Sequence, residues 1–353
     1  MPILEAATAI RPTIAARARE IELARRLPPD LAAHMAAVGL FRMGLPREIG
    51  GPEHDPATLL RAIETIGAAD ASAGWCVMIG VTSSLNAAWL APDVAREIFG
   101  PPDVISGGVF APMGRAIEDG DSYILSGKWQ WASGSANCHW LSGGAAIVVD
   151  GEVRRLKNGA PDSRMLFFPA GDATLIDSWH VAGLCGTGSG EMVVKDLRIP
   201  KGRSTSIVSD KPRANGALYA FPVFGLLALG IAAVMLGNAR AAADELVELA
   251  GPNLHTGVRL PGHLRDHISD GLILYLDRRV ELSGLDCVFP SRVRLDTDKR
   301  ECLVLRELQL HLHRARVRPL VRHTNAEARC PIGTIRSRVA RGRQQLVKAR
   351  HNA

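Results

Sequence analysis

Two short runs in the middle of the chain combine tryptophan, hydroxyl and glycine residues in a pattern that can hold a flat ring. The first is Trp129-Gln130-Trp131-Ala132-Ser133-Gly134, and the second is Gly186-Thr187-Gly188-Ser189. Indole faces stack on flat rings, while hydroxyl and backbone N–H groups hydrogen-bond to the polar edge of a ring. A tryptophan pair at the end of a strand is more often half-buried packing. The two runs therefore indicate a binding site for a flat ring only when they are taken together.

The glycine-rich second run also invites comparison with a phosphate-binding turn. That interpretation requires a helix directly after the glycines. Residues 191–194, with the sequence Glu-Met-Val-Val, predict a strand instead. We therefore exclude a dinucleotide-binding turn at this position.

The elements that position these runs change in type along the chain. Residues 6–100 have helical periodicity, and the predicted helices cover 6–27, 29–38, 56–66 and 70–90. Residues 104–200 carry short β-branched and aromatic runs separated by Gly, Asp and Asn, which predicts an antiparallel sheet or barrel. Helix returns over 221–249. This order of segregated helices and strands indicates an α+β fold.

Composition is that of an ordinary soluble globular protein. The 353 residues are 47% hydrophobic and 22% charged. The six cysteines include no C-x-x-C pair, so we expect no metal site and no disulfide framework, and with no visible secretory signal we expect a cytoplasmic protein. The apolar run 221–237 is short for a bilayer, and its glycines favour a helix buried in the core or a subunit interface over a membrane span.

Seven segments together resemble the acyl-CoA dehydrogenase superfamily, and most closely its flavin-dependent monooxygenase branch. They lie at 45–51, 69–75, 107–112, 129–134, 177–179, 186–189 and 194–200, so that the resemblance covers about residues 10–250. The resemblance implies an N-terminal helical domain, a β-barrel and a C-terminal four-helix bundle. It also implies FAD or FMN between barrel and bundle, and commonly a homo-oligomer.

The same resemblance implies the residues of the site. Trp131, Ser133 and Gly134 are the expected flavin-side contacts, and Thr187 and Ser189 are expected in a loop near the same pocket. Cys185 stands where relatives usually have an arginine, so one polar contact is lost. The catalytic base of such proteins comes from the bundle, which the sequence stops resembling after its first helix. The catalytic residue is therefore unknown.

The resemblance implies a flavin-dependent oxidoreductase in one of two versions. A dehydrogenase would remove a proton beside the thioester of an acyl-CoA, whereas a hydroxylase would take reduced flavin from a flavin reductase and transfer oxygen to an aromatic substrate. The Trp-Ala-Ser-Gly run and Trp75 favour the hydroxylase. Because the part of the bundle that supplies the base is missing, a third hypothesis is a flavin-binding fold with impaired or no turnover.

The C-terminal region differs in charge from the rest of the chain. Residues 251–353 contain 20 Lys+Arg and 10 Asp+Glu, a net charge of +10, which leaves −4 for residues 1–250. Within this region, 331–346 predict a helix with arginines outside an apolar stripe, which suits phosphates and guanine edges. This helix resembles region 4 of extracytoplasmic-function sigma factors. The resemblance implies DNA binding by Arg336, Ser337, Arg338 and Arg341.

The sequence therefore predicts an α+β fold with an N-terminal helical domain, a central antiparallel β-barrel, and an incomplete C-terminal helical bundle followed by a divergent helical tail. The predicted regions are 1–102 (helical domain), 103–205 (flavin-binding barrel), 218–250 (first bundle helix), 251–299 (unassigned) and 300–353 (tail resembling sigma region 4). A flavin-dependent oxidoreductase is the leading function. A DNA-binding protein acting through the tail is the alternative.

Overall fold

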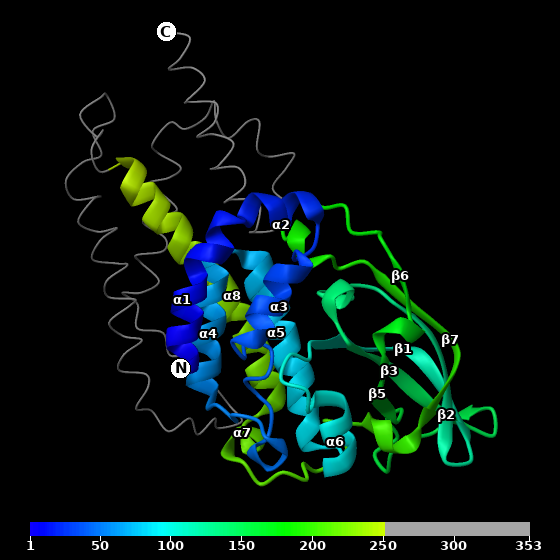
Figure 1. The fold of residues 1–353 in the computed structure, drawn as a ribbon. Helices are drawn as coiled ribbons and strands as arrows, with labels where there is room; N and C mark the ends of the chain where they lie inside the picture. The colour runs from blue at the N-terminus through cyan, green and yellow to red at the C-terminus, as the bar shows by residue number, and fades with distance from the viewer. Residues whose placement is uncertain (251–353) are drawn as a thin grey trace, which may run out of the picture. The chain divides into compact units, whose positions relative to one another are not determined.

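Six α-helices form the N-terminal part of the chain in the computed structural model, which describes residues 1–250 (Figure 1). Their bounds are α1 Ile3–Ala16, α2 Ala18–Ala24, α3 Pro29–Ala37, α4 Pro56–Ala69, α5 Ala71–Leu85 and α6 Pro92–Phe99. The helix predicted over 6–27 is wrong in one respect, because it divides at Arg17. The Arg17 backbone leaves helical geometry (φ −99°, ψ 7°), and its guanidinium pairs with Asp30 of α3 at 2.6 Å.

Side-chain caps start the two helices that support the site. The carboxylate of Asp55 accepts a hydrogen bond from Thr58 N at 3.0 Å, and Pro56 occupies the first position of α4. Asp70 accepts from Ala73 N at 2.8 Å and so begins α5 directly after α4. Both caps satisfy N–H groups that a helix start leaves without partners. Helix α5 is buried along most of its length.

Eight strands form one sheet after the helices. Their bounds are β1 Ser106–Asp119, β2 Ser122–Trp129, β3 Trp140–Val149, β4 Glu152–Val153, β5 Ser163–Pro169, β6 Thr174–Ile176, β7 Glu191–Pro200 and β8 Ser204–Thr205. The strand order is β6-β7-β2-β1-β3-β5-β8, with β4 paired to β3. Most pairs are antiparallel, but β1 and β3 are parallel. The prediction of an antiparallel barrel is therefore corrected to a mixed sheet with β6 and β8 at the ends of the pairing path.

A long helix, α8 (Val223–Ala250), follows the short α7 (Ala217–Ala220), as the sequence predicts for 221–249. Glycines let α8 approach α4 closely. A methyl group added at Gly237 would lie 2.2 Å from Glu64 O, and one added at Gly67 would lie 3.0 Å from Val234 O. The crossing of α4 and α8 therefore depends on residues without side chains.

Other side chains of α8 are partly exposed rather than buried, as Phe224, Leu229 and Ile231 show. Over Val223–Glu245 the helix is long and apolar enough to cross a membrane. Core helices of soluble proteins share these properties, so the finding is weak evidence for a span. These exposed side chains do not belong to the core of the described residues, so a core position is wrong for them, and a subunit interface along α8 stays a prediction.

Several predictions fall on residues 251–353, which lie outside the described residues. They are the unassigned region 251–299, the tail resembling sigma region 4, and DNA binding by Arg336, Ser337, Arg338 and Arg341. They stay predictions, as do the domain boundaries.

Candidate functional site

Trp129, the first tryptophan of the Trp-x-Trp run, belongs to the core of the sheet. Its side chain is fully buried, and Nε1 donates to Gly144 O at 2.8 Å. Three glycines, Gly114, Gly127 and Gly143, make room for the indole, since a methyl group at any of them would lie 2.5 Å from it. The expectation of two tryptophan faces beside a ligand is therefore wrong for Trp129.

Trp131, the second tryptophan, is exposed. Its side chain is 60% exposed, and its backbone has a φ of +61°. A left-handed backbone is uncommon for a bulky residue and is found where surrounding contacts impose it. Here Ala132 N donates to Gly190 O at 3.0 Å and Ser133 N donates to Trp131 O at 2.8 Å. The turn formed by residues 129–134, which we call the tryptophan turn, thus presents one indole outward.

Three buried hydroxyls connect the tryptophan turn to the loop before β7. The Oγ atoms of Ser133 and Ser189 are 2.6 Å apart, and Ser189 Oγ lies 2.6 Å from Thr187 Oγ1. Gly134 N also donates to Thr187 O at 2.7 Å. We call Ser133, Ser189 and Thr187 the hydroxyl chain. Four of the five residues predicted for the site therefore lie together, and Trp131 lies at the surface of the same turn.

Trp75 joins this arrangement from helix α5. Its Nε1 donates to Ser133 Oγ at 3.1 Å. The sequence indicated Trp75 only as part of a family motif, because 58 residues separate it from Ser133 and neither periodicity nor spacing predicts that contact. This bond ties the helices to the tryptophan turn.

Replacing Trp75 with phenylalanine tests this tie. We expect the free energy of unfolding to fall by about 1 kcal/mol, because the ring is kept but one hydrogen bond to a buried hydroxyl is lost. Urea denaturation measures the change. The matched control is Trp131→Phe, at an exposed position, which should change stability by less than about 0.5 kcal/mol. Equal losses in both variants would contradict the tie.

The loop between β6 and β7 is fixed to helix α2. The Arg25 guanidinium pairs with both carboxylate oxygens of Asp177 and also donates to Trp179 O at 3.1 Å. The hydrogen bond from Arg25 lowers the pKa of Asp177. Trp179 Nε1 donates to Leu184 O at 3.0 Å. The loop then leads into strand β7, so the exclusion of a dinucleotide-binding turn is confirmed.

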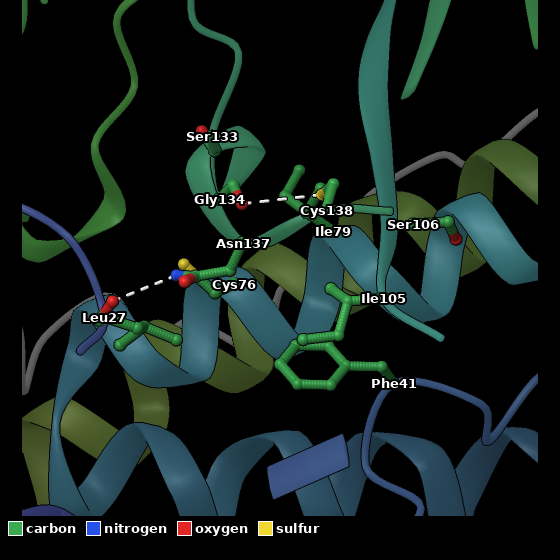
Figure 2. Close-up of a pocket in the computed structure, with 10 residues that line it drawn as sticks. All are labelled: Leu27, Phe41, Cys76, Ile79, Ile105, Ser106, Ser133, Gly134, Asn137 and Cys138. Carbon is green, nitrogen blue, oxygen red and sulfur yellow. Dashed lines mark hydrogen bonds between the residues drawn. The ribbon is translucent and has the colours of Figure 1, made fainter. Parts of the chain in front are cut away.

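A small cavity lies behind the tryptophan turn (Figure 2). Ser133 and Gly134 line it together with side chains of α5, such as Ile79, and of the segments before and after the helices, such as Phe41 and Ile105. Its free volume of about 10 Å³ holds roughly one water molecule. Burial raises the pKa of Cys138 to about 12 and also raises the pKa of Cys76, so both lining thiols stay protonated. This cavity is too small for a flavin ring.

A second group of exposed apolar side chains lies on β1 and α8. Phe110 and Phe224 meet edge to face with ring centroids 5.9 Å apart, and both are about half exposed. Strand β1 shifts its register against β3 between Val109 and Gly114, which turns Phe110 and Met113 outward. Bulges of this kind often re-aim side chains beside binding sites.

The described residues fit one wall of a flavin site. They supply an exposed indole face at Trp131, a nearly buried hydroxyl oxygen at Ser133, and a glycine at position 134 with a φ of +73°. These are the flat surface and polar edge that a flat heteroaromatic ring requires. Among residues 1–250, no group of three or more His, Cys, Asp or Glu side chains is placed to hold a metal ion.

The sequence of the chain is similar to those of known flavin-dependent proteins. The family described as "Acyl-CoA dehydrogenase, N-terminal domain" matches residues 4–92. Indole-3-acetate monooxygenase of Pseudomonas putida is 32% identical over 237 residues, which are 67% of this chain and 58% of that protein. The oxygenase subunit HsaA of Mycobacterium tuberculosis, a flavin-dependent monooxygenase, is 28% identical over 70% of this chain and 64% of its own length.

Solved structures show the same fold. The crystal structure of HsaA from M. tuberculosis superposes with a TM-score of 0.66 at 27% identity, covering 72% of this chain and 67% of that chain. XiaF from Streptomyces, solved with FADH2 and glycerol, gives a TM-score of 0.64 at 26% identity, covering 79% and 70%.

The fold and the sequence relatives together define the class. Residues 4–92 match the acyl-CoA dehydrogenase N-terminal domain, and the fold is similar to that of acyl-CoA dehydrogenase-like monooxygenases. The chain is a homologue of flavin-dependent monooxygenases and spans 58% to 64% of the length of the two curated relatives named above.

Proposed function

We propose that this chain binds a reduced flavin and acts as the oxygenase component of a flavin-dependent monooxygenase on a small aromatic substrate. One observation carries the proposal. In this chain, which is similar to such monooxygenases, the tryptophan turn presents the exposed Trp131 side chain and packs against the buried hydroxyl chain. Three named relatives support the choice of cofactor and reaction, namely an indole-3-acetate monooxygenase, an oxygenase subunit and a protein solved with FADH2.

In this proposal the described residues bind and orient the cofactor. Bound reduced flavin would supply the reaction with dioxygen and the transfer of one oxygen atom. Trp131 would lie against the ring, and Ser133 and Gly134 would contact its polar edge. The exposed apolar side chains of Phe110 and Phe224 would keep water from an aromatic substrate. A separate flavin reductase is the expected partner, because HsaA is named as an oxygenase subunit.

The catalytic base is not assigned to any described residue. His139 Nδ1 accepts a hydrogen bond from Ile105 N at 3.1 Å, and the His180 ring lies 3.3 Å from Arg25. Both imidazoles are thus engaged in contacts that hold local structure. The dehydrogenase version and the hypothesis of impaired turnover stay predictions, as do a cytoplasmic location and a homo-oligomer.

Flavin titration of the purified full chain tests the proposal. We expect quenching of tryptophan fluorescence on anaerobic addition of FADH2 or FMNH2. With a flavin reductase, NADH and a panel of phenols and indoles, we expect oxygen uptake with a hydroxylated product. Binding without a product would support the hypothesis of impaired turnover. No binding of reduced or oxidised flavin at micromolar protein would contradict the proposal.

The alternative predicted from the sequence is DNA binding through Arg336, Ser337, Arg338 and Arg341. No feature of residues 1–250 supports it, and those four residues lie outside the described part of the chain. Salt-sensitive retention on DNA that is lost when the three arginines become alanine would support this alternative.

A further inference from the structure

The hydroxyl chain has a direction, because its two ends are fixed. At one end, the Trp75 Nε1–H can only donate to Ser133; at the other end, the Leu184 carbonyl can only accept. Thr187 Oγ1 donates its single proton to Leu184 O at 2.8 Å. The 2.6 Å contact between Thr187 and Ser189 then requires Ser189 to be the donor. Ser189 must in turn accept the proton of Ser133 across 2.6 Å.

The reverse direction lacks a comparable end. If Ser189 donated to Ser133, the acceptor left for the Ser133 proton would be Trp131 O, at 3.5 Å. Thr187 Oγ1 would also give up its 2.8 Å contact with Leu184 O, but that carbonyl would keep Thr187 N at 3.1 Å and Trp179 Nε1 at 3.0 Å as donors, so the long contact between Ser133 and Trp131 O decides the direction. A contact of 3.5 Å is a poor hydrogen bond, whereas 2.8 Å is close to ideal. The forward direction is therefore the stable one.

Burial keeps this direction in place. Ser133, Thr187 and Ser189 are 4%, 1% and 5% exposed, so water hardly competes for their protons. With its proton given to Ser189 and one lone pair facing Trp75, Ser133 has one hydrogen-bonding position left. That position can accept a hydrogen bond but cannot donate one.

We propose that Trp75, Thr187 and Ser189 are positioning residues that hold Ser133 as a hydrogen-bond acceptor, and that this acceptor favours reduced over oxidised flavin. The inference rests on the proposed function, in which Ser133 contacts the ring. A reduced flavin carries an N–H donor at N5 of its central ring, and this nitrogen is a bare acceptor in the oxidised form. An acceptor oxygen therefore forms a hydrogen bond with the reduced ring and opposes another acceptor in the oxidised ring.

Thr187→Val is the variant that tests this inference. Valine has nearly the same shape but removes the acceptor for the Ser189 proton, so Ser189 can turn and donate to Ser133. The Ser133 proton then becomes available to a ligand. We expect the ratio of the Kd for FAD to the Kd for FADH2, measured anaerobically on the full chain, to fall about three- to tenfold, the size of one hydrogen bond. Thr187→Ser keeps the hydroxyl and should keep the ratio within about twofold.

Ser189→Ala is the second variant, because it also frees the Ser133 proton if the valine variant fails to fold. Circular dichroism establishes that each variant is folded. A fall in the ratio in either folded variant, with rescue by Thr187→Ser, supports the inference. Flavin binding with an unchanged ratio in the folded variants, or with an equal fall in Thr187→Ser, overturns the inference alone. Failure of the parent chain to bind either flavin overturns the proposed function and this inference with it.

Discussion

Replacement of Trp129 by alanine is expected to lower the free energy of unfolding by about 3 to 5 kcal/mol. The indole is fully buried and fills the space between Gly114, Gly127 and Gly143, which have no side chains of their own to occupy it. Alanine would leave a large cavity, and Gly144 O would lose the hydrogen bond that it accepts at 2.8 Å. Urea denaturation followed by circular dichroism measures the change. A loss below about 1 kcal/mol would contradict the role of Trp129 as the centre of the sheet core.

Two further variants separate the causes of that loss. Trp129→Phe keeps most of the ring but not the hydrogen bond, so it should lose less stability than Trp129→Ala. Gly143→Ala tests the same contact from the other side, because its methyl group would lie 2.5 Å from the indole. Overpacking of this kind usually costs about 1 to 3 kcal/mol. If Gly143→Ala were neutral, the space around the indole would be looser than the contacts indicate.

The sequence could predict elements whose signals are local. Pro29 and Pro56 lie at helix starts, and the predicted segments 29–38 and 56–66 correspond to α3 and α4. Strand β7 is harder to predict, since its apolar residues fall in two short runs, 192–194 and 197–199, that predict two strands. The two residues between them, 195 and 196, form an irregularity opposite Ser126, and Asp196 has a φ of +48°. The two runs form a single strand because both pair with β2, and the periodicity of the sequence gives no information on that pairing.

Strand β1 and its parallel pairing with β3 are a second feature that local sequence patterns do not predict. Residues 106–114 contain three glycines and a proline, which depress strand propensity, yet they begin β1, which pairs with β3 from Ser106 and with β2 from Gly114. Tertiary contacts overcome that propensity, because Gly144 lets the bulged part of β1 approach: a methyl group there would lie 2.3 Å from Phe110 O. Such a contact joins segments far apart in the sequence. Local patterns therefore predict the existence of the sheet better than its order.

The two tryptophans of the tryptophan turn show why the site was only partly predictable. In a continuing strand, residues two apart lie on the same face, so the spacing of Trp129 and Trp131 predicts a shared aromatic surface. The strand ends at Trp129, and the positive φ of Trp131 turns the second indole outward. The convergence of Ser133 with Thr187 and Ser189 was predicted through a family resemblance. Their mutual hydrogen bonds required the structure.

Replacement of Trp131 by alanine is expected to weaken flavin binding by about 5- to 30-fold without loss of stability. The side chain is 60% exposed, so its removal should change the free energy of unfolding by less than about 0.5 kcal/mol. Contact between an indole face and a flat ring is worth about 1 to 2 kcal/mol, which gives that change in Kd. Fluorescence titration with FADH2 under anaerobic conditions measures it. An unchanged Kd would remove Trp131 from the site.

Trp131→Gly extends the same test to the strained backbone. Glycine removes the indole as alanine does, but it also adopts a φ of +61° without steric cost. We therefore expect Trp131→Gly to be more stable than Trp131→Ala by up to about 1 kcal/mol while its Kd for flavin rises to the same extent. That outcome would show that the chain keeps a bulky, exposed residue in a costly conformation for what it binds. If both variants were less stable than the parent chain but bound flavin with the same Kd as the parent chain, the role of Trp131 would be to stabilise the fold.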